Sequence, residues 1–176
     1  MAWNNGPPVL YHGCDDASAR SIVSHGVDLT KCKPFRDFGQ GFYTTTSLAQ
    51  AKNWANIKCG WLSGKKTAKN RIATVIRFDV DRDQLATAEF LAFVTEVTNT
   101  DFWDFVKNCR QEQPPGEHRR IGGTNYDVVF GPVAIWRQTL VIKDCDQISF
   151  HTDQGIKCLG SARVEMQQNQ TDPLFP

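Results

Sequence analysis

The sequence predicts a single α+β domain, and three observations lead to this prediction. A short apolar strand, Val9–Gly13, runs directly into a segment whose apolar residues recur at helical spacing. A glycine-rich turn then feeds a second strand, and a helix-start signal at Ser47 follows it. The second half of the chain, between residues 126 and 152, reads as strands. With 176 residues the chain is long enough for one compact domain and short for two.

The composition is that of a soluble globular protein, with 40% hydrophobic and 22% charged residues. The 20 Lys and Arg residues against 19 Asp and Glu give a formal net charge of +1, so a nucleic acid or an anionic membrane would have to be bound through a local patch. No run approaches the roughly 20 apolar residues of a membrane span. The first residues lack the features of a secretory signal, so we expect a cytoplasmic or nuclear protein without a membrane partner.

The six cysteines are scattered and form no C-x-x-C pair, and none of the four histidines stands at zinc spacing from a cysteine. We therefore expect free thiols and no metal site. Cys14 lies beside the first motif, where it is either a small space-filling residue, the interpretation we favour, or a reactive thiol.

The first strand ends in Tyr11-His12-Gly13, and Asp15 or Asp16 can cap the helix that follows. Gly26 stands where a C-cap glycine belongs. His12 thus lies at the carboxyl end of a strand just before a helix, a position at which ligands often meet a sheet. A structural role for a lone histidine is the alternative.

The stretch 37–45 places Gly39 and Gly41 before the aromatic pair Phe42-Tyr43 and a run of threonines. Glycine permits a tight turn, and the residues after it favour an extended strand, so the turn should present Tyr43 at a fixed place. A hairpin with a buried tyrosine is the simpler interpretation. The helix after Ser47 carries Trp54, either as a core residue or as the lining of a pocket.

The middle of the chain predicts a strand at 71–80 and two helices, one from Asp83 to Val97 and one after the cap candidate Thr100. Residues 111–120 should form an exposed loop. A strand at 126–134 should stop at Gly131-Pro132, residues 139–142 extend it or pair with it, and residues 146–152 form another strand. Asp153 should cap a short helix to Leu159, residues 162–166 form an edge strand, and the tail from Gln167 is expected to be disordered.

In this order the motifs resemble those of the diphtheria-toxin-like, poly(ADP-ribose)-polymerase-like branch of the ADP-ribosyltransferases. The first match runs from Tyr11-His12-Gly13 to Gly26, and the second from Gly39 through Tyr43 to the aromatic Trp54, eleven residues later. About 70 residues at the two ends of the chain carry the resemblance. It implies one catalytic domain over residues 1–166, with residues 81–123 as a helical insertion peculiar to a subgroup.

The resemblance implies a split mixed β-sheet with helices around a cleft that binds NAD as co-substrate. If the site residues of that branch are transferred to the matching positions of this sequence, backbone groups of Gly13 would hold the nicotinamide carboxamide. His12 would hydrogen-bond a ribose hydroxyl. Tyr43 would pack on the nicotinamide, and its neighbour Thr44 would also contact NAD. Trp54 would supply the stacking aromatic ring. No metal is implied.

The third motif of that branch is a glutamate or a substitute for it, and here the matching residue is Gln147. Its amide can hydrogen-bond a ribose hydroxyl, but it supplies neither a full negative charge nor a base. The resemblance therefore implies single transfer of ADP-ribose rather than chain elongation. Asp146 alternates to the opposite face of the strand, and Glu165 is a more distant candidate.

The function predicted from the sequence is mono-ADP-ribosylation of an acceptor that is a protein, a nucleic acid or a small molecule. An NAD glycohydrolase and a catalytically silent module that binds NAD or ADP-ribose remain alternatives. RNA 2′-phosphotransferase chemistry would need clustered arginines, and Arg119-Arg120 is the only adjacent pair. Oligomeric state, and a role as toxin, effector or housekeeping enzyme, are left open.

Overall fold

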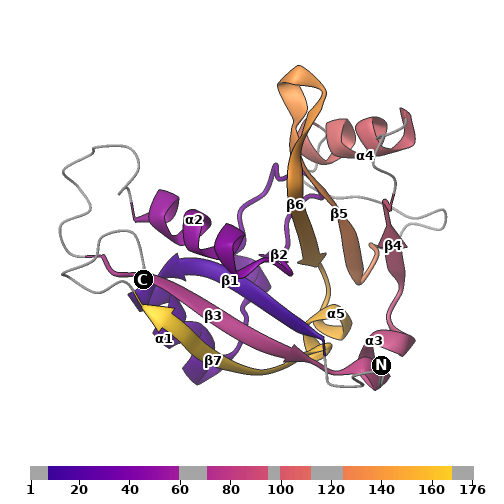
Figure 1. The fold of residues 1–176 in the computed structure, drawn as a ribbon. Coiled ribbons are helices and arrows are strands. Elements are labelled where there is room, and N and C mark those ends of the chain that lie inside the picture. The colour runs from indigo at the N-terminus through magenta and orange to yellow at the C-terminus, as the bar shows by residue number, and fades with distance from the viewer. Residues whose placement is uncertain (1–7, 60–70, 95–99, 112–124, 168–176) are drawn as a thin grey trace, which may run out of the picture. The chain divides into compact units, whose positions relative to one another are not determined.

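The structure is a computed structural model that describes residues 8–59, 71–94, 100–111 and 125–167. The chain forms two compact units. The first comprises Met1–Gly26, Thr46–Thr87 and Lys157–Pro176, and the second comprises Val27–Thr45 and Ala88–Ile156. The described part has an α+β fold with two β-sheets and five α-helices, which confirms the α+β class predicted from the sequence (Figure 1).

The first unit is built on an antiparallel three-stranded sheet in the order β1-β3-β7. Its strands are β1 (Val9–Asp15), β3 (Ala73–Val80) and β7 (Leu159–Gln167). The central strand β3 is buried along most of its length, in keeping with its β-branched and apolar sequence. The helices of this unit are α1 (Asp16–His25), α2 (Leu48–Lys58) and α3 (Arg82–Thr87).

The helix caps follow the sequence signals. Asp15 is the N-cap of α1, because its side chain accepts a hydrogen bond of 2.8 Å from the Ser18 amide. Gly26 closes the helix with φ of 82°, in the left-handed region that favours glycine. Ser47 caps α2 by accepting from the amide of Gln50 at 3.2 Å, as the capping box predicts.

Helix α2 lies along β1 at close range (Figure 1). Its small residues Ala51 and Ala55 are fully buried against the sheet. A Cβ atom on Gly13 would lie only 2.0 Å from the carbonyl oxygen of Ala51 and 2.7 Å from the amide nitrogen of Ala55. Gly13 is therefore required for this packing, whatever else its backbone does.

The second unit is built on a four-stranded mixed sheet in the order β2-β6-β5-β4. Its strands are β2 (Phe42–Thr44), β4 (Phe90–Ala92), β5 (Val128–Ile135) and β6 (Leu140–Phe150). All pairings are antiparallel except that of β4 with β5. Helix α4 (Thr100–Gln111) buries Phe102 and Val106 in a core with Phe38 and Val129. The shorter helices are η1 (Leu29–Lys31), η4 (Trp136–Gln138) and α5 (Asp153–Lys157), which belongs to this unit as far as Ile156.

The helix predicted from Asp83 to Val97 is wrong beyond Thr87. Helix α3 ends there, and Phe90–Ala92 forms β4, which runs parallel to β5. The amide of Glu89 donates to the carboxylate of Asp127 at 2.8 Å, and this long-range contact outweighs the local helix propensity. The segment 81–123 is accordingly not a purely helical insertion, since it supplies a strand to the sheet.

The strand predicted to stop at Gly131-Pro132 instead continues to Ile135. Strand β4 pairs only with Val128–Phe130, so beyond Phe130 that side of β5 is an edge where proline is tolerated. The two strands expected at 139–142 and 146–152 are one strand, β6. The cap of α5 is Thr152, which accepts from the Gly155 amide, and not Asp153. The predicted edge strand is confirmed as β7, whereas the loop at 112–120 and the tail after Gln167 lie outside the described residues.

Candidate functional site

The glycine turn holds the hydroxyl of Tyr43. Gly39 has φ of 88°, and this folds the turn back so that the tyrosine hydroxyl donates to the Gly39 carbonyl at 2.8 Å. The same oxygen accepts from the amide of Phe38 at 3.0 Å. Burial raises the pKa of the Tyr43 hydroxyl well above its ordinary value, so it stays neutral. The prediction that the turn fixes Tyr43 is confirmed. The local hairpin is wrong, because Tyr43 pairs with Ser149 on β6.

The second glycine of the turn makes room for a histidine that sequence analysis missed. A Cβ atom on Gly41 would lie 2.6 Å from Nδ1 of His151. His151 is buried, with Nδ1 2.8 Å from the carbonyl oxygen of Gln40 and Nε2 2.7 Å from the hydroxyl of Ser149. Its ring meets that of Tyr43 edge-on, with centroids 6.3 Å apart. His151 therefore ties the turn to the end of β6.

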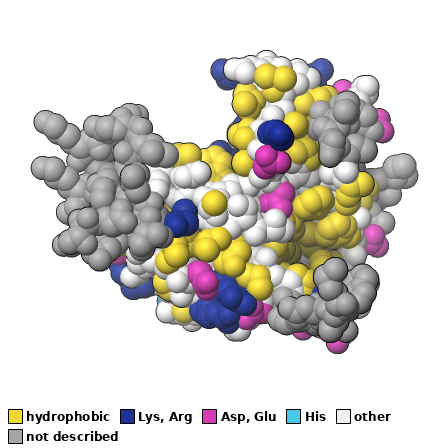
Figure 2. All heavy atoms as spheres, in the orientation of Figure 1, with side chains coloured by type: hydrophobic (Ala, Val, Ile, Leu, Met, Phe, Trp, Pro, Cys, Tyr) yellow, Lys and Arg dark blue, Asp and Glu magenta, His cyan; other side chains and the backbone are white. Residues whose placement is uncertain are grey.

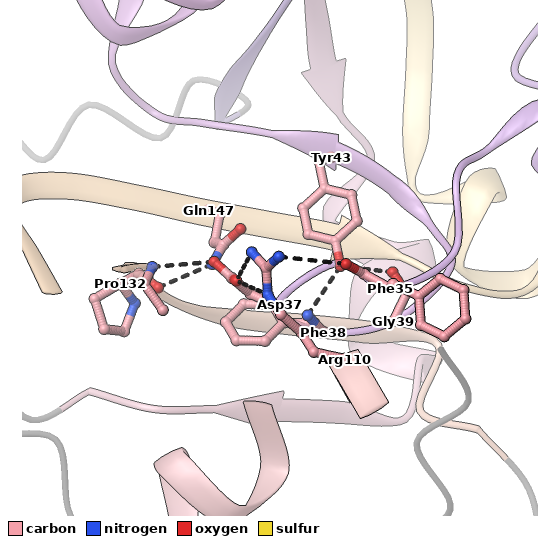
Figure 3. Close-up of polar contacts among 9 residues, drawn as sticks. Phe35, Asp37, Phe38, Gly39, Tyr43, Arg110, Pro132 and Gln147 are labelled. Carbon is pink, nitrogen blue, oxygen red and sulfur yellow. Dashed lines mark hydrogen bonds and ion pairs between the residues drawn. The ribbon is translucent and has the colours of Figure 1, made fainter. Parts of the chain in front are cut away.

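Gln147 is buried, and its amide group is oriented by two acceptors. Nε2 donates to a carboxylate oxygen of Asp37 at 2.8 Å and to the carbonyl of Pro132 at 2.9 Å (Figure 3). Because both partners are acceptors only, the nitrogen and oxygen of the amide can be assigned from the network. Both amide hydrogens are thereby used. The oxygen Oε1 accepts no hydrogen bond from the described part of the chain.

Asp37 and Arg110 complete this network, and neither was predicted as a site residue. Asp37 is 4% exposed, and Nε of Arg110 donates to its carboxylate at 2.8 Å while Nη2 contacts the same oxygen. The other carboxylate oxygen accepts from the amide of Ala134 at 3.0 Å as well as from Gln147. A buried carboxylate needs such partners, since an unpaired charge in the interior is costly.

The turn brings the second and third motifs together within the second unit. Residues paired across antiparallel strands share a face, so Tyr43 lies on the same face of the sheet as Ser149 and, two residues along, Gln147. The segment Asp37–Gly39 contacts both side chains, Gln147 through Asp37 and Tyr43 through the other two residues (Figure 3). This connection could not be predicted from the sequence, because turn residues were assigned only a conformational role.

The neighbouring candidates have structural partners. The hydroxyl of Thr44 is buried and donates to the Ile148 carbonyl at 3.0 Å, which holds β2 to β6. Asp146 accepts from the hydroxyl of Thr45. Glu165 is exposed on β7 in the first unit.

The remaining predicted residues belong to the first unit. Tyr11 and Gly13 face α2, so His12 points to the opposite face of β1, where it pairs with Ile76. Strand β1 is an edge of its sheet, which leaves backbone groups on one side of the strand outside the β-ladder. Trp54 is 44% exposed on α2 and is therefore not a core residue.

All six cysteines are free thiols. Cys14 is buried, and burial raises its pKa to about 12, so it fills space rather than serving as a nucleophile. Among the described residues no group of three or more His, Cys, Asp or Glu side chains is placed to bind a metal ion. Within the same residues, no helix is long and apolar enough to cross a membrane.

A family profile described as "Protein of unknown function (DUF3990)" matches residues 9–139, which is most of the chain. The match includes the strand with His12, the glycine turn, Tyr43 and Arg110, and it ends before β6 and Gln147. A comparison with curated protein sequences finds no significant match.

Proposed function

The chain belongs to the DUF3990 family, and we propose that it is a mono-ADP-ribosyltransferase. It would cleave NAD at the nicotinamide glycosidic bond and transfer one ADP-ribose to an acceptor. The resemblance of the motifs at His12, Tyr43 and Gln147 motivates the proposal. The observation that carries it is the fixed orientation of the Gln147 amide.

Gln147 can take over the hydrogen-bonding part of a catalytic glutamate. Asp37 and the Pro132 carbonyl take both hydrogens of Nε2, so the group left to meet a ligand is the oxygen Oε1, a pure acceptor. A ribose hydroxyl is a donor of the kind that this oxygen can accept. Because the amide is already oriented, no reorganisation is needed when the substrate arrives, and preorganised polar groups are the ones that stabilise transition states best.

The reaction needs little proton transfer from the protein. The bond between the ribose C1′ and the nicotinamide nitrogen breaks with both electrons going to the nitrogen, and this cancels the positive charge of the ring. The acceptor nucleophile then forms the new bond to C1′ and gives its proton to water. Gln147 offers a partial negative charge beside the cationic ribose, whereas Tyr43 provides a ring surface for the departing nicotinamide. His12 would hydrogen-bond a ribose hydroxyl.

The proposal is tested by measuring nicotinamide release from NAD, with and without a crude lysate as a source of acceptors. We expect release that requires the lysate and that falls at least about 100-fold in Tyr43→Ala and His12→Ala. His25→Ala is the matched control for His12, because His25 is exposed at the end of α1 and is not among the predicted site residues.

Gln147→Met tests the role of the oriented Gln147 amide, the observation on which the proposal rests. It keeps the length of the side chain and removes the acceptor oxygen together with the Nε2 donor, so release should fall while the protein remains folded by circular dichroism. Release with water alone would show a glycohydrolase. NAD binding without any release would overturn the catalytic proposal and leave a binding module.

A further inference from the structure

The second unit carries a pocket that lies outside the predicted site. It is formed by one side of α4 and by η4 at the turn between β5 and β6, and its volume is about 380 Å³. This is at the lower end of the size range of small-ligand pockets. Its lining includes two tryptophans, two basic residues, one acidic residue and polar side chains, among them Trp103, Trp136, Lys107, Arg137, Asp104 and Gln111.

The two indoles are held in place and remain partly accessible. Trp103 packs edge-on against the buried ring of Phe102, with centroids 4.9 Å apart. Trp136 is half-buried and packs at the margin of the core. The guanidinium of Arg137 lies 5.6 Å from the centroid of its ring, and that of Arg110 lies 5.8 Å away. Rigid aromatic rings beside guanidinium groups are suited to stacking a flat ligand.

The basic side chains of the pocket are available to a ligand. Lys107 and Arg137 are exposed, and within the described residues neither forms an ion pair with a carboxylate. The charge of Arg110, by contrast, is matched by Asp37. With Asp104 as the acidic residue of the lining, the pocket carries a net charge of about +1. An anionic ligand is therefore favoured.

We propose that this pocket binds one nucleotide of a single-stranded nucleic acid. Its base stacks on the indoles of Trp103 and Trp136, and its phosphate contacts Lys107 and Arg137. A single strand is favoured because a base must be unstacked to enter. Beside the pocket, the hairpin tip exposes the hydrophobic side chains of Ile135, Leu140 and Ile142, on which neighbouring bases can pack (Figure 2).

The pocket connects to the candidate catalytic residue through direct contacts. Arg110 lies over Trp136 on one side and donates to Asp37 on the other, and Asp37 accepts from Gln147. A strand bound at the pocket thus lies next to the network of Gln147. This identifies a nucleic acid as the acceptor, a conclusion that rests on the proposed transferase function, whereas nucleotide binding at the pocket does not.

The test is fluorescence anisotropy of the full chain with labelled single-stranded DNA and RNA of about 12 nucleotides, in the absence of NAD. The one phosphate held by Lys107 and Arg137 predicts that raising the salt from about 50 to about 200 mM weakens binding roughly 2.6-fold. Trp136→Leu should weaken it about 5- to 150-fold, the range of one lost stacking contact. Lys107→Glu with Arg137→Glu should abolish the salt dependence. Lys157→Glu reverses the charge of an exposed lysine of the first unit that does not line the pocket, and it should have little effect.

The charge variants change exposed residues, so they remain informative if Trp136→Leu fails to fold. Absence of binding at low salt would overturn the proposal, and so would binding that Lys107→Glu with Arg137→Glu leaves unchanged. Duplex of the same sequence that binds as tightly would overturn the single-strand assignment. The proposal would also be overturned if AMP or NAD binds at the pocket and oligonucleotides do not, or if only acidic peptides bind. Oligonucleotide binding without nicotinamide release would refute the transferase while leaving the pocket as proposed.

Discussion

Replacing Gln147 by glutamate should destabilise the protein rather than improve its active site. The new carboxylate would lie where the amide now donates to Asp37 at 2.8 Å. Two unit charges about 4 Å apart repel by about 4 kcal/mol at an effective dielectric constant of 20. Arg110 offsets part of this through its contact with Asp37. We expect Gln147→Glu to lower the free energy of unfolding by about 2–4 kcal/mol at pH 8.

The loss should depend on pH. Repulsion from Asp37 raises the pKa of the new glutamate in the folded state above its unfolded value of about 4.3. Between these two pKa values the folded state binds more protons than the unfolded state, so stability falls as the pH rises, by about 1.4 kcal/mol for each pH unit. The deficit should therefore be largest at pH 8 and small near pH 4.5, where the protonated carboxyl donates a hydrogen bond to Asp37.

The assay is urea unfolding at pH 5 and pH 8, with Gln147→Met as the control. The methionine variant loses the same hydrogen bonds without adding a charge, at a cost of about 1–3 kcal/mol that does not depend on the titration of residue 147. The difference between the two variants isolates the electrostatic term. If Gln147→Glu and Gln147→Met are equally stable at both pH values, the contact between residue 147 and Asp37 is not as described and the reasoning is refuted.

Three further predictions concern stability and reactivity. Gly13→Ala should lower the free energy of unfolding by more than about 3 kcal/mol in thermal or urea unfolding, because its Cβ would collide with the backbone of α2. Gly26→Ala should cost about 1–2 kcal/mol, because its Cβ meets open space but its φ is positive. Equal costs would contradict the close approach of α2 to Gly13. Tyr43→Phe loses the hydrogen bonds of the hydroxyl with the Phe38 amide and the Gly39 carbonyl, and it should lower the free energy of unfolding by about 1–3 kcal/mol. Most of the nicotinamide release should remain, since the ring is retained. A loss of release as complete as in Tyr43→Ala would assign the hydroxyl a direct role. In native protein at pH 8, Cys32 should be alkylated well before Cys14, because the Cys14 thiol is buried and has a pKa of about 12. Mass spectrometry of the peptides measures the order of labelling. Early labelling of Cys14 would contradict its burial.

The elements that could be predicted from the sequence are those determined by local chemistry. The caps of α1 and α2 depend on Asp15, Gly26 and Ser47, each of which acts on residues within one helical turn. The turn that fixes Tyr43 depends on the positive φ of Gly39, which is again a local property. Such signals are contained in a few consecutive residues and can be read without knowledge of the tertiary structure.

The features that escaped prediction depend on contacts between distant residues. Strand β4 exists because Phe90–Ala92 pairs with β5 about 38 residues later, and its own sequence favours a helix as readily as a strand. Asp37 and Arg110 are 73 positions apart, and neither residue type carries a signal that would join them. Strand alternation placed Gln147 and Asp146 on opposite faces, but it could not show which partners Gln147 would meet.

The glutamine at position 147 follows from the fold once Asp37 is taken into account. Asp37 is nearly inaccessible to solvent and already has Arg110 and the Ala134 amide as donors, and its last acceptor site faces residue 147. A glutamate there would create a second buried charge, whereas an amide donates to Asp37 and keeps an acceptor oxygen without adding a charge. The buried ion pair of Asp37 and Arg110 therefore favours a donor at position 147. Glutamine supplies this donor, and its Oε1 remains the acceptor that the proposed transferase would need.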